Sequence, residues 1–203
     1  MKDILRLIVV LTSLCIVSAI ALAKIYDLTK GPIAYQKRLE VLRAIKTVLP
    51  PYENEPDRDT VKLPIGIDKR GEEAQRAFYR GRKDGRLTGV AFEVISREGY
   101  GGDIELMVGI LPNGTVYGVE VLSHLETPGL GAKITKGKFK DRFKNRNLSN
   151  TRWAVKKDAG DVDGITGATV SSRAVIKAVK EGLEFYRDHE VSIVGPSQQG
   201  GVR

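Results

Sequence analysis

The sequence predicts an α+β protein, in which an N-terminal transmembrane helix precedes one domain built from an antiparallel sheet packed by helices. Three observations predict this class. An uncharged apolar run extends from Leu7 to Ala23, β-rich segments flank a hairpin signal at Pro112-Asn113-Gly114-Thr115, and apolar residues recur at helical spacing from Val170 to Tyr186. The chain beyond the anchor is long enough for one domain with a core, but not comfortably for two.

Residues 1–25 are expected to form the membrane anchor. Counted from Ile4 to Ile25, the apolar run approaches the roughly 20 residues that cross a bilayer. A cleaved signal peptide is the alternative, because small residues stand at Ser18-Ala19 and Ala21-Leu22-Ala23, but the run exceeds the usual signal core of roughly 7 to 15 residues. Positive residues stand on both sides of the run, so charge alone leaves the orientation open.

Residues 26–70 are predicted to form a helical connector and a loop. Gly31-Pro32 should break or kink the first helix, and a second, amphipathic helix is expected from Pro32 to Val48. Pro50-Pro51 stops that helix, and the acidic, proline-punctuated stretch from Tyr52 to Lys62 is typical of a loop.

The globular domain is expected over residues 71–190. A turn is expected at Asp84-Gly85. The strands are predicted from segments rich in β-branched and aromatic residues, namely Arg76 to Arg82, Leu87 to Ser96, Ile104 to Leu111 and Val116 to Ser123.

The last two strands should form a hairpin with Asn113-Gly114 as its two-residue loop. That register places Gly109 opposite Gly118 on one face of the sheet. Because paired glycines weaken a sheet, we expect something flat or bulky against them, with the C-terminal helix favoured over a ligand ring. On the other face the same register pairs Ile110 with Tyr117, Val108 with Val119 and Leu106 with Val121.

A C-terminal helix is predicted to begin at the end of the run Asp163 to Ser171, with Thr169 in its first turn or at its cap. Unpaired N–H groups and the helix dipole favour a phosphoryl group at such a position. On residue chemistry alone, however, a hydroxyl residue before an apolar helix is more often only a cap. Residues 191–203 are expected to form a disordered tail.

The composition excludes several kinds of function. Cys15 is the only cysteine and His124 and His189 are the only histidines, which rules out a disulfide framework or cysteine-ligated cluster and leaves little for a metal. Redox chemistry would therefore need an organic cofactor. The net charge is +8, but no nucleic-acid recognition motif is present, so anionic membrane lipid is the simpler partner.

Two further segments carry polar side chains. His124 and Glu126 stand two residues apart in a turn-rich segment, where an ordinary hydrogen-bonded turn is favoured over a metal pair or an acid–base couple. The stretch from Lys133 to Arg146 is basic, and most such stretches are solvated faces. The alternative is a docking surface for an acidic partner or for the pyrophosphate of a modifying enzyme's nucleotide.

Two motifs resemble those of the FMN-binding domain family. Asp163 to Thr169 matches every fixed position of the flavinylation motif Asp-Gly-x-Ser/Thr-Gly-Ala-Thr, and His124 to Lys133 is similar to the second hallmark, His-x-Glu-Thr-Pro-Gly-Leu-Gly-Ala-Lys. The resemblance implies that Thr169 carries FMN through a phosphoester bond, with no catalytic residue and no metal. The other cofactor-binding residues that it implies are Asp163, Gly164, Thr166, Gly167, Ala168, Ser171, His124, Glu126, Thr127, Leu130, Gly131 and Lys133.

Individual roles follow from the same resemblance. Thr166 and Ser171 are expected to donate hydrogen bonds to the phosphate. Asp163 is expected either to cap the turn or to be recognised during flavin attachment. Lys133 is expected to stabilise the reduced, anionic ring.

Within this family the chain resembles the G subunits of Rnf-type electron-transport complexes, with the C subunits of sodium-pumping NADH:quinone reductases as the alternative. The resemblance implies a non-autonomous, electron-carrying subunit of an ion-translocating ferredoxin:NAD oxidoreductase. Its partners would be other membrane subunits and a flavin transferase, and its FMN domain would lie on the outer, periplasmic side of the cytoplasmic (inner) membrane. A stand-alone membrane-anchored flavoprotein and an unmodified basic scaffold are the other candidates.

Overall fold

The structure, a computed structural model, describes residues 2–67 and 73–195. It divides into two compact units, Met1–Glu40 and Val41–Arg203. Helix α1 (Lys2–Val48) makes up the described part of the first unit, and its last turns, from Val41, belong to the second.

In the first unit, α1 exposes apolar side chains such as Leu7 and Leu22. The helix is long and apolar enough to cross a membrane, and a signal sequence would have the same character. The break considered at Gly31-Pro32 does not occur, because α1 continues through Pro32. A helix can lose one backbone hydrogen bond at a proline and continue when the turns on either side are intact.

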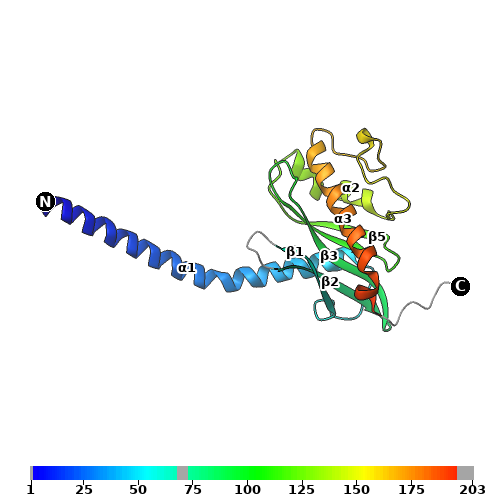
Figure 1. Ribbon diagram of the computed structural model, residues 1–203, viewed down its shortest axis with the longest axis horizontal. Helices are drawn as coiled ribbons and strands as arrows, with labels where there is room; N and C mark the ends of the chain where they lie inside the picture. The colour runs from blue at the N-terminus through cyan, green and yellow to red at the C-terminus, as the bar shows by residue number, and fades with distance from the viewer. Residues whose placement is uncertain (1, 68–72, 196–203) are drawn as a thin grey trace. The chain divides into compact units, whose positions relative to one another are not determined.

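The second unit contains a five-stranded antiparallel sheet with the strand order β1-β2-β3-β4-β5 (Figure 1). The antiparallel α+β class expected from the sequence is thereby confirmed. The strands are β1 (Thr60–Ile67), β2 (Glu73–Lys83), β3 (Arg86–Ser96), β4 (Ile104–Ile110) and β5 (Val116–His124).

Strand β1 was not predicted, since part of it was assigned to the loop from Tyr52 to Lys62. It contains Pro64, and its pairing with β2 shifts register between Pro64 and Gly66. A proline cannot donate to a neighbouring strand, so it is tolerated on an edge strand such as β1. The local composition of β1 therefore did not predict a strand, because β1 depends on pairing with β2.

The two hairpins turn differently. Asp84 and Gly85 form a two-residue turn with positive φ angles of 50° and 74°, as the sequence predicted. In the β4–β5 hairpin, Leu111 N–H donates to Thr115 O, so the loop has three residues ending in Gly114 at φ 77°. The two-residue loop expected at Asn113-Gly114 is therefore wrong.

This longer loop changes the register next to it. Val108–Val119, Leu106–Val121 and Gly109–Gly118 pair as predicted, but Ile110 pairs with Val116 rather than Tyr117. Tyr117 is the extra residue of a bulge and lies partly exposed.

Helices cover both faces of the sheet, because alternate side chains of a strand point to opposite sides. Helix α3 (Thr169–Val194) covers one face, with Phe92 and Val108 in the main core (Figure 1). The end of α1 covers the other face, where Ile45 and Val48 pack with Met107. Short helical turns connect β5 to α3: η1 (Gly131–Thr135), α2 (Gly137–Lys140), η2 (Asp141–Phe143) and η3 (Lys156–Asp158).

The glycine pair faces the end of α1. A Cβ placed on Gly109 would lie 1.9 Å from Val48 O, and one on Gly118 would lie 3.2 Å from Val48 Cα. Neither the C-terminal helix nor a ligand ring occupies this surface, so both expectations for it are wrong. The bare sheet allows the α1 backbone to approach closely.

Helix α3 begins at Thr169, as expected, and its predicted apolar stripe is buried except for Val170. The helix includes Val191 to Val194, four residues of the segment for which disorder was expected, and Gly195 follows it. The rest of that segment, residues 196–203, lies outside the described residues.

Candidate functional site

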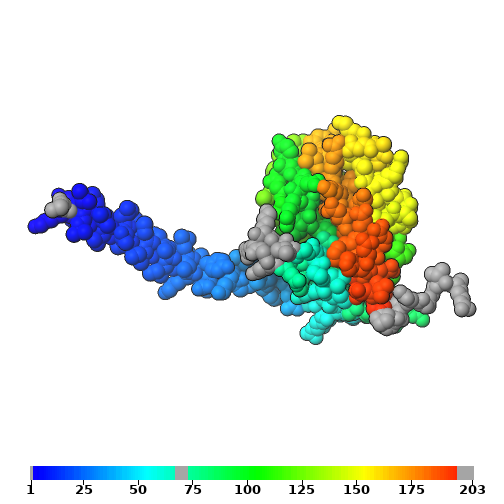
Figure 2. Space-filling model, viewed as in Figure 1, coloured from blue at the N-terminus to red at the C-terminus, as the bar shows by residue number. Residues whose placement is uncertain are grey.

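Three segments that are far apart in the sequence meet at the start of α3. They are the β3–β4 loop, the loop after β5 and the turn that precedes α3. Figure 2 shows the orange start of α3 between green atoms of the first half of the domain and yellow atoms of the segment before α3. Together they enclose a pocket of ≈ 380 Å³, within the range of small-molecule sites. Its lining residues are Tyr100, Glu126, Thr127, Leu130, Gly131, Gly167, Ala168, Thr169, Val170 and Ser171.

Thr169 is the first residue of α3 rather than its cap. The cap position is Ala168, and no side chain forms a cap hydrogen bond there. Within the described residues, the Thr169 hydroxyl forms no hydrogen bond. The interpretation of Thr169 as only a helix cap is therefore wrong. Thr169 lines the pocket, and its hydroxyl has no hydrogen-bond partner among the described residues.

The turn before Thr169 is shaped by Ser172. Ile165 N–H donates to Ser172 Oγ at 2.9 Å, and this hydroxyl donates to Ala168 O at 2.9 Å. Gly167 supplies the positive φ of 82° that the turn needs. Ser172 was not predicted as a site residue, although a hydroxyl in the first turn of a helix commonly bonds nearby backbone.

The upstream half of the motif is held by Arg142, which was also not predicted individually. Its guanidinium donates to Asp163 O at 2.6 Å and to Gly164 O at 2.8 Å. The Asp163 carboxylate pairs with Lys156 at 3.0 Å, and the hydrogen bond from Lys156 lowers the pKa of Asp163. Asp163 and Gly164 do not line the pocket.

Glu126 is the most buried charged residue of the site, with 4% of its surface exposed. Its Oε2 accepts a hydrogen bond from Ser171 Oγ at 2.5 Å, and its Oε1 accepts one from Gly101 N–H at 3.2 Å. The carboxylate therefore joins the β3–β4 loop to the first turn of α3. Because this bond uses the only hydroxyl proton of Ser171, Ser171 cannot donate to a phosphate while the bond is kept.

His124 supports the same region from outside the pocket. Its Nδ1 accepts a hydrogen bond from Glu126 N–H at 3.1 Å, which confirms the hydrogen-bonded turn favoured for these two residues. Lys133 and Thr166 are exposed and do not line the pocket. Tyr100 and Val170 line it without having been predicted as site residues.

The basic stretch from Lys133 to Arg146 has mixed roles. Lys133 and Lys138 are exposed to solvent, as expected for a solvated basic face. Lys140 is different, because it pairs with Glu120 at 2.6 Å, and Arg146 donates to the backbone oxygens of Arg142 and Asp161. Part of this stretch therefore stabilises the fold next to the motif.

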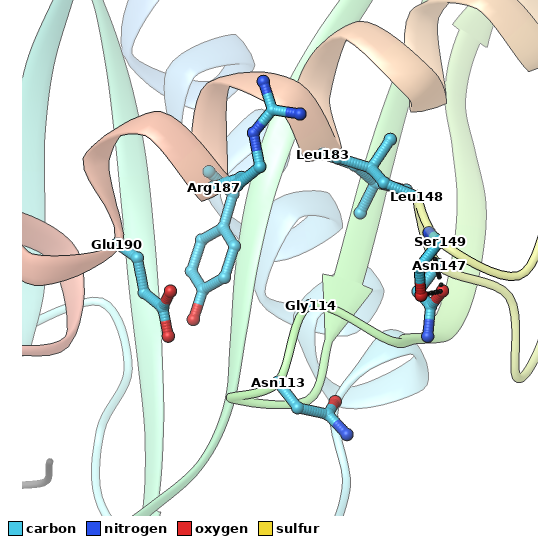
Figure 3. A pocket seen from close by; sticks show the side chains of 9 residues that line it. Asn113, Gly114, Asn147, Leu148, Ser149, Leu183, Arg187 and Glu190 are labelled. Carbon is cyan, nitrogen blue, oxygen red and sulfur yellow. Dashed lines mark hydrogen bonds between the residues drawn. The ribbon is translucent and has the colours of Figure 1, made fainter.

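A second pocket, of ≈ 190 Å³, lies away from the motif. It lies between α3, the turn at Asn113-Gly114 and the 147–149 loop (Figure 3). Tyr186 lines it and donates its hydroxyl to Pro112 O at 2.9 Å, and burial, together with nearby Glu190, raises the pKa of this phenol. None of the predicted site residues lines this pocket.

The comparisons with known proteins agree with the geometry. The FMN-binding domain family matches residues 99–184, a range that includes every residue lining the pocket at the start of α3. The chain is 37% identical over 187 residues to the G subunit of the ion-translocating oxidoreductase complex of Aliivibrio fischeri, covering 88% of each chain. It is 38% identical over 180 residues to the G subunit from Vibrio cholerae, covering 86% of each.

The chain belongs to the family of G subunits of ion-translocating oxidoreductase complexes. A further member, from Cereibacter sphaeroides, is 35% identical over 188 residues, covering 89% of this chain and 83% of that protein. Among solved structures, the C subunit of the Na⁺-translocating NADH-quinone reductase from Parabacteroides distasonis has the same fold. Its TM-score is 0.52 at 22% identity, with 76% of this chain and 91% of that chain covered.

Membership of this G-type family supports FMN as the cofactor and implies other subunits. The apolar part of α1 fits a membrane-anchored protein. The pocket also fits the cofactor chemically. It combines an unpartnered hydroxyl and the backbone of a helix start with the aromatic and aliphatic side chains of Tyr100, Leu130 and Val170.

Proposed function

We propose that this protein is the electron-carrying subunit of a membrane-bound, ion-translocating oxidoreductase complex, and that it carries FMN esterified through its phosphate to Thr169. The observation that supports this most directly is the Thr169 hydroxyl, which lines the pocket but caps nothing and bonds to none of the described residues. FMN, when bound, accepts and releases electrons through its isoalloxazine ring.

The protein's own groups would bind and orient the cofactor. The first N–H groups of α3 have no partners inside the helix and suit a phosphate, which an ester leaves with one negative charge. The helix start would stabilise that charge by about 0.3–1 kcal/mol. Arg142 and Ser172 would act indirectly on the cofactor, because they hold the turn that precedes Thr169.

We further propose that the complex is of the Rnf type and links ferredoxin to NAD. The relatives that cover most of the chain at 35–38% identity are named as G subunits of ion-translocating oxidoreductase complexes. The likeness to the C subunit of the Na⁺-translocating NADH-quinone reductase rests on fold at 22% identity. Sequence similarity therefore favours a G subunit of an Rnf-type complex over a C subunit of a Na⁺-translocating NADH-quinone reductase.

The remaining parts of the proposal concern maturation and position. A separate flavin transferase would attach the FMN, with the exposed Asp163 as its recognition element. The anchor would span the cytoplasmic membrane once, in contact with lipid, and the domain would lie on the outer side. A cofactor joined covalently to the protein cannot be lost by dilution there.

Intact mass tests the attachment. We expect the full-length protein, purified from a host that supplies the transferase, to be heavier than its sequence by FMN less one water, and to fluoresce in a denaturing gel. Thr169→Ala should abolish the gain, whereas Thr166→Ala should retain it, because Thr166 stands three residues earlier and does not line the pocket.

An unmodified wild-type chain would contradict the proposal and would favour the basic scaffold. A gain that persists in Thr169→Ala would place the ester elsewhere. A flavin-bearing chain that purifies from gentle detergent without other membrane subunits would instead favour a stand-alone flavoprotein.

A further inference from the structure

Tyr100 stands out at the edge of the candidate site, because its side chain is 74% exposed although its loop is tightly held. Within the described residues its ring forms no hydrogen bond and no aromatic contact. It lines the pocket that Thr169 also lines, together with Leu130 and Val170, which are 46% and 44% exposed. Single exposed apolar side chains are ordinary, but several around one pocket mark a binding surface.

The backbone that carries Tyr100 has little freedom. A Cβ on Gly99 would lie 2.1 Å from Gly102 O, and one on Gly101 would lie 1.9 Å from Leu125 O. Gly102 has a φ of 138°, which side chains rarely allow. The loop therefore packs against the segment after β5 with no room for side chains on either side of Tyr100.

Glu126 connects this loop to the helix that carries Thr169. One carboxylate oxygen accepts from Gly101 N–H, and the other accepts from Ser171 Oγ, two residues after Thr169. Gly131 leaves room for this arrangement, because a Cβ there would lie 2.3 Å from Glu126 Oε2. A single buried carboxylate thus sets the position of Tyr100 relative to Thr169.

We propose that Tyr100 is the aromatic contact for the isoalloxazine ring of the FMN on Thr169, and that Glu126 is the positioning residue that keeps Tyr100 there. The inference rests on the proposed function. Two flat aromatic systems gain from contact, and the tightly packed loop presents Tyr100 without a cost for ordering the backbone. Glu126 is 4% exposed and each of its oxygens accepts one hydrogen bond from the loop or the helix, so we assign it a positioning role.

Flavin fluorescence tests the contact, because a tyrosine ring against an isoalloxazine ring quenches its emission. Full-length wild type, Tyr100→Leu, Tyr100→Trp and Tyr117→Leu are purified from the host that supplies the transferase, and intact mass gives their FMN content. Emission per bound FMN is then compared before and after unfolding. Tyr117 is the matched control, since it is a partly exposed tyrosine of the same domain that does not line the pocket.

We expect Tyr100→Leu to raise the emission of the folded protein several-fold, with Tyr100→Trp and Tyr117→Leu close to wild type. Wild-type emission in Tyr100→Leu would overturn the inference while leaving the proposed function intact, and Tyr100 would then be free to contact a neighbouring subunit. A wild-type chain without the FMN mass would overturn both.

The positioning role of Glu126 is tested by one conservative variant and one truncating variant. Glu126→Gln keeps an oxygen that can accept from Gly101 N–H and an amide that can donate to Ser171 Oγ, so emission should stay near wild type. Glu126→Ala should raise emission toward the Tyr100→Leu level, and the double variant should show no additional rise. Wild-type quenching in Glu126→Ala would overturn the positioning role, and a loss of quenching in Glu126→Gln equal to that in Glu126→Ala would also count against it.

Discussion

At the scale of single residues, the motif loop takes its shape from side chains outside the motif's fixed positions. Ser172 bonds to the backbone on both sides of Gly167, and Arg142 reaches the loop from 21 residues away. The Arg142 guanidinium also lies over the Phe139 ring, 5.5 Å from its centroid. The fixed positions therefore supply a permissive backbone, and their neighbours select one conformation.

Replacing Arg142 tests this view. Arg142→Gln removes a charged donor from two backbone oxygens and should lower the free energy of unfolding by about 1–2 kcal/mol. It should also lower the fraction of chains that carry FMN, because the loop is less well held. Urea unfolding followed by the fluorescence of Trp153 gives the first quantity, and intact mass gives the second.

Lys138→Gln is the matched control for Arg142→Gln. It removes one positive charge from the same basic stretch, but Lys138 is exposed and holds no part of the motif loop. If the two variants lose FMN equally, general charge rather than the Arg142 contacts governs the attachment.

At the scale of elements, the glycine pair of β4 and β5 is where α1 joins the domain. Val48 lies so close to Gly109 that even a methyl group would overlap its carbonyl oxygen. Ala44, Ile45 and Val48 are buried there with Met107. The last turns of α1 are consequently part of the domain's core rather than a linker.

Gly109→Ala should therefore destabilise the domain by about 2–3 kcal/mol, because the added methyl group overpacks a site bounded by backbone. Gly137→Ala is the matched control, since only Asp141 Oδ2, at 3.9 Å, lies near its added Cβ. It should leave stability unchanged or raise it by up to about 1 kcal/mol, as expected for glycine to alanine in a helix. Equal urea midpoints for the two variants would contradict the contact between Gly109 and Val48.

At the scale of the whole molecule, one helix serves two units. Its first part exposes apolar side chains over a length that suits a bilayer, and its last turns belong to the domain. The helix is continuous from Lys2 to Val48.

The proposed topology can be measured by cysteine labelling. In a Cys15→Ala background, a cysteine at Lys138 should react with a membrane-impermeant maleimide in cells whose outer membrane is permeabilised. A cysteine at Lys2 should react only after the cytoplasmic membrane is broken. The reverse pattern would contradict an outer location of the domain, and a mature protein that lacks residue 2 would indicate a cleaved signal peptide.

Much of the fold and of the site was predictable because it depends on local sequence. The strands β2 to β5, the Asp84-Gly85 turn and the start of α3 each follow from a pattern of neighbouring residues. Strand β1 and the bulge at Tyr117 did not, because the first depends on a partner strand and the second on how a hairpin loop closes.

The sequence by itself determined the fold class, the two motifs and Thr169 as the residue at the start of the helix. Only the tertiary structure decided what covers the glycine pair and which side chains surround Thr169. The hydrogen bond between Ser171 and Glu126 joins residues 45 positions apart. Patterns along the chain report the preferences of neighbours, whereas a contact across such a separation exists only once the sheet and α3 have packed together.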